Sequence, residues 1–317
     1  MHGEQEMESN GEVVFRQKDG LVQTIKSIYW SAIASALYRK SLSHAEQGRK
    51  KLVTFSDDMI SHQINIYGVH EGVLLDALFD WLTTRYPQMM ARAKSEGTVI
   101  DGGANIGNHS LYFSDHFGKV IAFEPNPATF DVLKLNAQLV RNVETHRLGL
   151  SDEKGSAQLS IEDANMGASS IVSADSDDAK LTIDLECLDD VLAPDENVLM
   201  LKLDVEGHEF QALGGAKKLI ERAKPIVMFE QLEREFVDGC SPVVERLRDY
   251  GYHRFVSVRE TPDIKRSVPA ILRHPGLAAM RLAFGNGVSI TSVSDLKPDF
   301  YPLLIALPDW LENTDTA

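Results

Sequence analysis

A glycine-rich loop carries the first chemistry that the sequence suggests. Asp101 ends a short apolar run and is followed by six residues that include Gly102, Gly103 and Gly107. Glycine lets a backbone turn sharply and approach a ligand closely, and the first N–H groups of a following helix attract anions. Asp101 would repel a pyrophosphate but suits an ammonium group, such as that of a methionyl moiety. The loop therefore predicts a cofactor site, with Asn105 as a further contact.

Polar residues after the next two β-type runs extend this site. Glu124 follows the second run, roughly 20 positions after the loop, where nucleotide-binding sheets place the acid that holds ribose hydroxyls. Pro125 and Asn126 shape the turn below it, and we assign all three to cofactor binding. Ser151 and Asp152 follow the third run, where the edge of an adenine would lie, although such a pair is also typical of a turn or a helix cap.

An acidic cluster follows the next buried run of apolar residues. Asp204 and Glu206 alternate, so in extended geometry they point to the same side, and His208 and Glu230 are expected at the same edge of the sheet. One interpretation is catalytic, with these side chains accepting a proton from an acceptor hydroxyl or positioning it. The alternatives are a divalent metal site and a helix start favoured by the helix dipole. We favour catalysis and assign no metal.

Other polar residues border the loop on its helical side. His109 and Ser110 follow the loop directly, and His70 and Glu71 precede the first predicted strand. A histidine in the first turn of a helix is more often structural than catalytic. We therefore treat His109 and Ser110 as secondary candidates, and we expect His70 and Glu71 to border the methionine end of the cofactor.

The elements that must position these residues alternate between strands and helices, which predicts an α/β fold with a mostly parallel sheet. We expect about seven sheet strands, the last one antiparallel. The predicted strands are Thr98–Ile100, Lys119–Phe123, Val143–Leu148, Val198–Leu203, Pro225–Phe229, Tyr252–Val258 and Tyr301–Ala306. The predicted helices are Leu21–Tyr38, Gly72–Leu82, Asn108–Phe117, Pro127–Val140, Phe210–Arg222 and Pro242–Tyr250. Gly155–Ile161 and Lys180–Leu185 alternate like an inserted antiparallel hairpin.

The composition of the chain excludes several classes of protein. The chain has 317 residues and a formal net charge of −15, which argues against a general nucleic-acid binder. Its two cysteines, Cys187 and Cys240, show no metal-ligand spacing and no disulfide framework. We see no signal peptide and no apolar run that could span a bilayer. We expect a cytoplasmic protein with a small-molecule or glycan acceptor, without stable membrane insertion, and the sequence leaves a homo-oligomer open.

We expect two parts in the chain. Residues 1–70 form a helical extension whose first 20 residues are expected to be disordered, and residues 71–317 form the catalytic domain. Within the extension, Leu21–Tyr38 is interpreted as a helix packed on the domain rather than at a membrane surface, because its faces are mixed. Residues 260–298 form a lid, or alternatively a surface excursion, with a short helix at Leu277–Phe284. This segment carries four basic residues, Lys265, Arg266, Arg273 and Arg281.

The ordered motifs resemble those of one family. The segments VIDGGANIGNHS, IAFEPNP, LGLSDEKG, LKLDVEGHE and PIVMFE, between Thr98 and Glu230, are similar to the FkbM-type methyltransferases. The resemblance implies a Rossmann-like class I methyltransferase fold, S-adenosylmethionine as the methyl donor, and O-methylation of a sugar or secondary metabolite. It also implies that Asp101, Gly103, Asn105, Gly107, Glu124 and Asn126 bind the cofactor and that Asp204, Glu206 and Glu230 face the reaction centre. The flanking segments would determine the choice of acceptor.

Two alternatives remain at this stage. A nicotinamide-dependent oxidoreductase also uses a glycine-rich loop, but Ala104 stands where a dinucleotide needs the middle glycine. A cofactor-binding regulatory protein would retain the loop and lack a working acidic cluster. Calorimetry with NADH and S-adenosylhomocysteine distinguishes the first alternative, and a methyl-transfer assay distinguishes the second.

Overall fold

The chain divides into two compact units, Met1–Arg49 and Lys50–Ala317. The structure is a computed structural model that describes residues 4–7, 13–16, 21–56, 58–160, 171–172, 180–261, 276 and 287–313. The first unit contains β1 (Glu4–Met7) and β2 (Val13–Arg16), which pair antiparallel, and the long helix α1 (Leu21–Glu46). The larger unit holds all the motifs assigned to the cofactor site, and the division of the chain at residue 70 stays a prediction.

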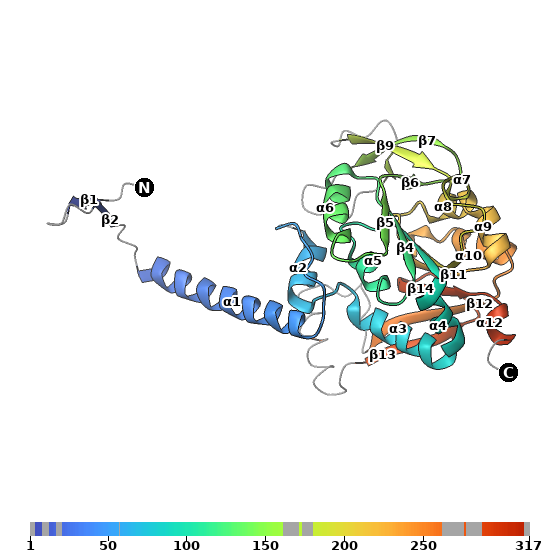
Figure 1. Cartoon of the computed structure of the whole chain (residues 1–317), viewed down its shortest axis with the longest axis horizontal. Coiled ribbons are helices and arrows are strands. Elements are labelled where there is room, and N and C mark those ends of the chain that lie inside the picture. Colours follow the sequence, from blue (N-terminus) through green and yellow to red (C-terminus); the bar gives the residue numbers. More distant parts are fainter. Residues whose placement is uncertain are drawn as a thin grey trace. The chain divides into compact units, whose positions relative to one another are not determined.

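A sheet of eight strands forms the centre of the larger unit (Figure 1). Its strands are β3 (Thr98–Gly102), β4 (Lys119–Phe123), β5 (Val143–His146), β10 (Val198–Leu203), β11 (Ile226–Gln231), β12 (Arg254–Thr261), β13 (Gly287–Val293) and β14 (Tyr301–Leu307). Their order is β13-β12-β14-β11-β10-β3-β4-β5. Strands β5, β4, β3, β10 and β11 pair in parallel, whereas β14 is antiparallel to β11 and β12, and β13 is antiparallel to β12. The predicted mostly parallel sheet with an antiparallel last strand is thus confirmed.

Helices cover both faces of this sheet. They are α2 (Met59–Tyr67), α3 (Gly72–Arg85), α4 (Pro87–Glu96), α5 (Asn108–Phe113), α6 (Pro127–Ala137), α7 (Leu188–Val191), α8 (Glu209–Gly215), α9 (Lys217–Ala223), α10 (Pro242–Asp249) and α12 (Trp310–Asn313), with a 3₁₀ turn at Glu233–Glu235. Side chains of β3 alternate between the faces. Val99 packs in a core with Leu78 of α3, whereas Ile100 packs in a second core with Leu213 of α8. Strand β3 is therefore buried along its whole length.

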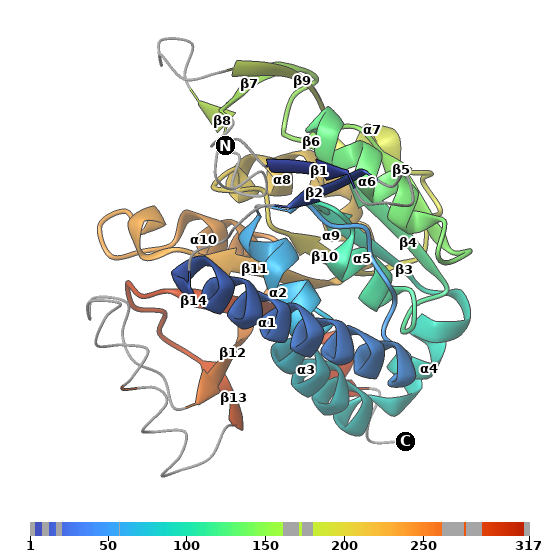
Figure 2. The same ribbon diagram turned by 90° about the vertical axis from the view of Figure 1, so that its left-hand side faces the viewer.

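A second sheet extends from the main one (Figure 2). It comprises β6 (Gly149–Leu150), β7 (Gly155–Ser160), β8 (Ile171–Val172) and β9 (Lys180–Glu186) in the order β6-β9-β7-β8. Pairing of β7 with β9 is antiparallel, as the alternating pattern predicted. The predicted loop between the two strands lies mostly outside the described residues. Leu159 and Ile183 are buried on this sheet, which therefore presents an apolar surface near the cofactor loop.

Several elements differ from the sequence predictions. The strand β13 adds an eighth member to the sheet because it pairs along its whole length with β12. The helix α4 was not predicted, since its sequence is largely polar, and the residues that it buries are Met89, Met90 and Ala93. The predicted helix Phe210–Arg222 is two helices, α8 and α9, which break at Ala216. Part of the segment 1–20, expected to be disordered, forms the β1–β2 pair. The predicted helix at Leu277–Phe284 and the basic residues of the lid lie outside the described residues.

Candidate active site

The cofactor loop connects β3 to α5 through left-handed backbone positions. Gly103 has φ +72°, and a Cβ on it would lie 1.8 Å from the carbonyl oxygen of Asp204, so the loop presses directly on the chain that leaves β10. Asn105 has φ 52°, and Gly107 starts α5 with φ 91°. Only glycine permits the approach at position 103. The sequence therefore brings the glycine loop and the acidic turn together at one sheet edge.

The N–H groups of the loop are already used within the protein. Those of Gly103 and Ala104 both donate to the carbonyl of Phe123, and that of Gly107 donates to the carbonyl of Ala104. The N–H of Asn105 donates to Glu124, and that of Ile106 to the Asn105 side chain. A dinucleotide needs such groups for its pyrophosphate. Their internal pairing favours a cofactor without phosphates.

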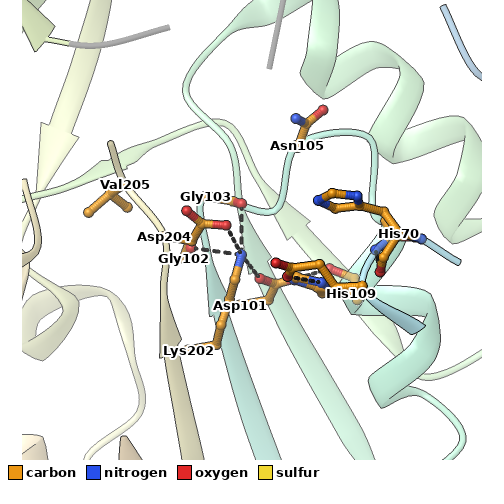
Figure 3. A network of polar contacts seen from close by, with 12 residues as sticks. His70, Asp101, Gly102, Gly103, Asn105, His109, Lys202, Asp204 and Val205 are labelled. Atoms are coloured by element: carbon orange, nitrogen blue, oxygen red, sulfur yellow. Dashed lines mark hydrogen bonds and ion pairs between the residues drawn. The ribbon is translucent and has the colours of Figure 1, made fainter. Parts of the chain in front are cut away.

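A buried lysine fastens the loop to β10 (Figure 3). The Lys202 ammonium lies 3.0 Å from Asp101 Oδ1 and 3.3 Å from Asp204 Oδ2, and it donates to the carbonyl of Gly103 at 3.1 Å. Ser110 Oγ donates to the other Asp101 oxygen at 2.6 Å. Although burial disfavours the ammonium, Asp101 and Asp204 raise the pKa of Lys202 above its ordinary value. The lysine therefore stays charged and holds both sides of the site.

Glu124 is buried at the end of β4. Its two carboxylate oxygens each accept one backbone N–H, from Asn105 at 3.0 Å and from Asn126 at 2.8 Å. Burial raises the pKa of this carboxyl to about 7, although the two N–H groups oppose the shift. Each oxygen retains a lone pair that can accept a hydroxyl group. The geometry is suited to a ligand with two adjacent hydroxyls, such as a ribose.

A pocket of about 940 Å³, open to solvent, lies along the loop. Its apolar end is lined by Leu148, Leu150 and the buried Leu159 and Ile183 of the second sheet. Its other walls include Gly103, Asn105, Glu124, Pro125, Asp204, Glu206 and His208. The pocket thus combines apolar walls, a carboxylate suited to two hydroxyls and further acidic side chains, which matches an adenosyl group joined to a cationic amino acid. We call this space the cofactor pocket.

A second pocket of about 570 Å³ adjoins the first. It is lined by Glu71, Glu230 and the apolar residues Met228, Phe229 and Leu303, at the ends of β11 and β14. Six residues line both pockets: Ile60, His70, His109, Lys202, Asp204 and Glu206. We call these six residues the shared wall and the second space the acceptor pocket. A group transferred from one pocket to the other would pass along this wall.

The acidic turn after β10 is held by a residue that the sequence pattern does not single out. Glu209 is buried, and its carboxylate accepts the N–H groups of Val205 at 2.9 Å and Gly207 at 3.4 Å. Burial raises the pKa of Glu209 to about 7. Between these contacts Glu206 adopts φ 55°, a left-handed conformation that is costly for a non-glycine residue. Burial and the nearby Asp204 raise the pKa of Glu206 to about 7.

A clamp positions the secondary candidates on the shared wall. The Asn108 side chain accepts the N–H of His70 at 3.0 Å and donates to the His70 carbonyl at 3.0 Å. This places Glu71 Oε2 3.4 Å from Nε2 of the buried His109. Glu71 itself adopts φ 58°. The polar pair Glu71–His109 thus faces the acceptor pocket, and amphipathic patterning carries no signal for such a contact.

Other predicted residues take supporting positions. Asp101 is fully buried beside Lys202 and Ser110. Asp101, Gly102 and Gly107 line neither pocket. The Asn126 side chain caps α6 by accepting the N–H of Ala128. These residues shape the cofactor pocket from behind it.

The remaining candidates occupy different positions around the two pockets. Ser151 Oγ lies 3.0 Å from His208 Nε2 and also contacts Asp152, so these three residues gather around the end of β6. Burial lowers the pKa of His208. His208 lines only the cofactor pocket and Glu230 only the acceptor pocket, whereas Asp204 and Glu206 line both. Among the described residues, no group of three or more His, Cys, Asp or Glu side chains is arranged to hold a metal ion.

The sheet order, the loop without free N–H groups and the ribose-type carboxylate define a class I methyltransferase that uses S-adenosylmethionine. Residues 101–254 match the methyltransferase FkbM domain. The methyltransferase sdnD of Sordaria araneosa is 30% identical over 200 residues, covering 51% of this chain and 76% of that protein. The chain belongs to the FkbM methyltransferase family, which decides against the nicotinamide alternative.

Two further comparisons have narrower reach. The hexuronic acid methyltransferase AglP of Haloferax volcanii is 31% identical over 145 residues, covering 44% of this chain and 58% of that protein. The crystal structure of magnesium protoporphyrin IX methyltransferase from Synechocystis PCC 6803 with bound S-adenosylmethionine covers 93% of this chain and all of that one, with 10% identity and a TM-score of 0.39. The likeness to this crystal structure is too low to support any statement about the acceptor.

Proposed function

We propose that the protein transfers a methyl group from S-adenosylmethionine to a hydroxyl oxygen of a sugar, a glycan or a secondary metabolite. The observation that carries this proposal is the shared wall, where Asp204 and Glu206 border both the cofactor pocket and the acceptor pocket. A hydroxyl must lose its proton during or after attack on a methyl group, and a carboxylate beside it can accept that proton. The relative that methylates hexuronic acid supports a sugar-type acceptor.

The residues of the cofactor pocket fit the donor. Leu148, Leu150 and Ile183 would contact the adenine, Glu124 would accept the ribose hydroxyls, and Asp204 would face the methionyl ammonium. When bound, the donor supplies an electrophilic methyl group on a sulfonium. The protein's task is then to orient the acceptor and to exclude water, since proximity supplies much of the rate of such transfers.

Glu206 is the general base in this proposal. It lines both pockets, and its pKa of about 7 lets it both accept and release a proton near neutral pH. Glu230 and the Glu71–His109 pair would position the acceptor from the other side of the acceptor pocket. His208, at the Ser151 end, would contact the cofactor instead of the acceptor. The lid at residues 260–298 stays a prediction.

Methyl transfer from tritiated S-adenosylmethionine tests the proposal. The acceptor panel comprises a uronic acid glycoside, a neutral glycoside and a hydroxylated polyketide, and product analysis identifies the methylated atom. We expect an O-methyl product and a lower kcat for Glu206→Gln, with a smaller effect of this variant on S-adenosylhomocysteine affinity. Glu245→Gln on the exposed surface of α10 is the matched control and should keep full activity. N- or S-methylation, or full turnover by Glu206→Gln, would contradict the proposal.

A further inference from the structure

Helix α1 exposes an unusual number of large apolar side chains. Ile25 is 58% exposed and Trp30 63% exposed. The other exposed large apolar residues of the helix are Leu21, Val22, Ile28, Tyr29, Leu37, Tyr38 and Leu42. Soluble proteins rarely leave a contiguous apolar surface of this kind uncovered unless it binds something. The helix lies in the smaller unit of the chain.

Four apolar residues follow one side of α1 over its first part. Val22, Ile25, Tyr29 and Ile33 recur at intervals of three and four residues, as the same face of a helix requires. The opposite side carries a stripe of small polar residues, Thr24, Ser27, Ser31 and Ser35, at the same intervals. This part of the helix is therefore amphipathic without being strongly charged.

The same face becomes basic in the last turns of α1. Arg39 follows Leu21, and Lys40 follows Val22, by eighteen residues, which is about five helical turns. The two cations therefore lie in line with the apolar residues, while Tyr38 and Leu42 lie on the other side. Averaged over its whole length, the helix loses its one-sided pattern, which explains why the faces look mixed in the sequence. One continuous face is apolar at its start and basic at its end.

The charge of helix α1 indicates what kind of partner it binds. Residues 21–45 contain no Asp or Glu, although the chain has a net charge of −15. Pairing with α1 of a second copy would bring Arg39 and Lys40 against a helix that has no acidic group to neutralise them before Glu46. A partner must instead offer both an apolar layer and negative charge. Anionic lipids provide the two together, and Trp and Tyr side chains such as Trp30 prefer that interface.

We propose that α1 binds the surface of an anionic membrane. Ile25, Tyr29 and Trp30 enter the boundary between headgroups and acyl chains, and Arg39 and Lys40 meet lipid phosphates. The helix lies in the plane of the surface, since none of the described helices has the length and apolarity needed to cross a bilayer. Membrane-surface binding, which the sequence pattern alone disfavours, thus follows from the exposure and the register of these side chains.

Vesicle binding by the full chain tests this inference. We expect binding to vesicles of equimolar phosphatidylglycerol and phosphatidylcholine and little binding to phosphatidylcholine alone. Ile25→Asp should weaken binding at least about tenfold, because it removes one apolar side chain from the interface. The matched control is Ser27→Asp, two residues away on the opposite face, which adds the same charge and should have a smaller effect. Arg39→Gln with Lys40→Gln should weaken binding by about 25-fold, at about fivefold for each cation.

Fluorescence adds an independent measurement. Trp30 should shift its emission to shorter wavelength on mixed vesicles, and Trp30→Phe should abolish the shift. Equal binding to both vesicle types, or equal weakening by Ile25→Asp and Ser27→Asp, would overturn the proposal. So would a vesicle-free dimer that Ile25→Asp dissociates, which would identify a second copy as the partner. Absence of vesicle binding together with strong protection of α1 from hydrogen exchange would instead indicate docking onto the chain itself.

Discussion

Replacing Lys202 by methionine should be among the most damaging substitutions near the active site. The Lys202 side chain is 4% exposed and that of Asp101 fully buried, with their charged atoms 3.0 Å apart. Lys202→Met leaves the Asp101 carboxylate buried without a cation and removes a donor from the carbonyl of Gly103. Breaking a buried pair from one side costs about 3–5 kcal/mol. We expect a loss of this size in the free energy of unfolding, with weaker S-adenosylhomocysteine binding.

Urea denaturation followed by circular dichroism measures the first effect, and calorimetry measures the second. Lys119→Met is the matched control, because Lys119 pairs with Glu144 and Glu196 while 40% exposed, and it should cost at most about 1 kcal/mol. Adding Asp101→Asn to Lys202→Met should recover part of the loss, since no buried charge then stands alone. The reasoning is refuted if both lysine variants lose the same stability, or if the double variant is less stable than Lys202→Met.

Two further predictions concern the cofactor pocket. Gly103→Ala should cost about 2–4 kcal/mol of stability and abolish S-adenosylhomocysteine binding, because its Cβ meets the Asp204 carbonyl at a left-handed position; Gly155→Ala, which has open space around it, should change neither quantity. Glu124 has a pKa raised to about 7 by burial, so its contribution to stability is complete below about pH 4.5 and is lost as the pH rises through 7. Ribose hydroxyls favour the carboxylate, so cofactor binding near pH 7 should release a proton, seen by calorimetry in buffers of different ionisation enthalpy; equal proton release by Glu124→Gln would contradict this.

The sequence predicted the parts of the site that short segments encode. The glycine loop, Glu124 and the Asp204–Glu206 turn each follow a strand directly, so a recognisable pattern places them at the same sheet edge. The fold class followed from the same alternation. The structure then added what depends on distant segments, because contacts between remote residues leave no periodic signal in a sequence.

Particular residues show this limit. Asp101 attracts attention as a cofactor ligand, yet its partner Lys202 comes from another strand and buries it. The contact of Glu71 with His109 depends on the Asn108 clamp, which joins segments on either side of β3. In helix α4, the three buried side chains lie within a largely polar sequence, which gives no clear helical pattern. In each case tertiary packing, rather than local pattern, decides the outcome.

The shared wall has a consequence for how the two ligands affect each other. Since Lys202, Asp204 and Glu206 border both pockets, a ligand in either one changes the electrostatic surroundings of the other. Equilibrium linkage requires any such effect to be reciprocal. The donor brings a positive sulfonium to this acidic wall, and the product S-adenosylhomocysteine has lost it. Acceptor affinity should therefore differ between the two cofactor states. Loss of the sulfonium charge during turnover would then also change how tightly the enzyme binds the acceptor.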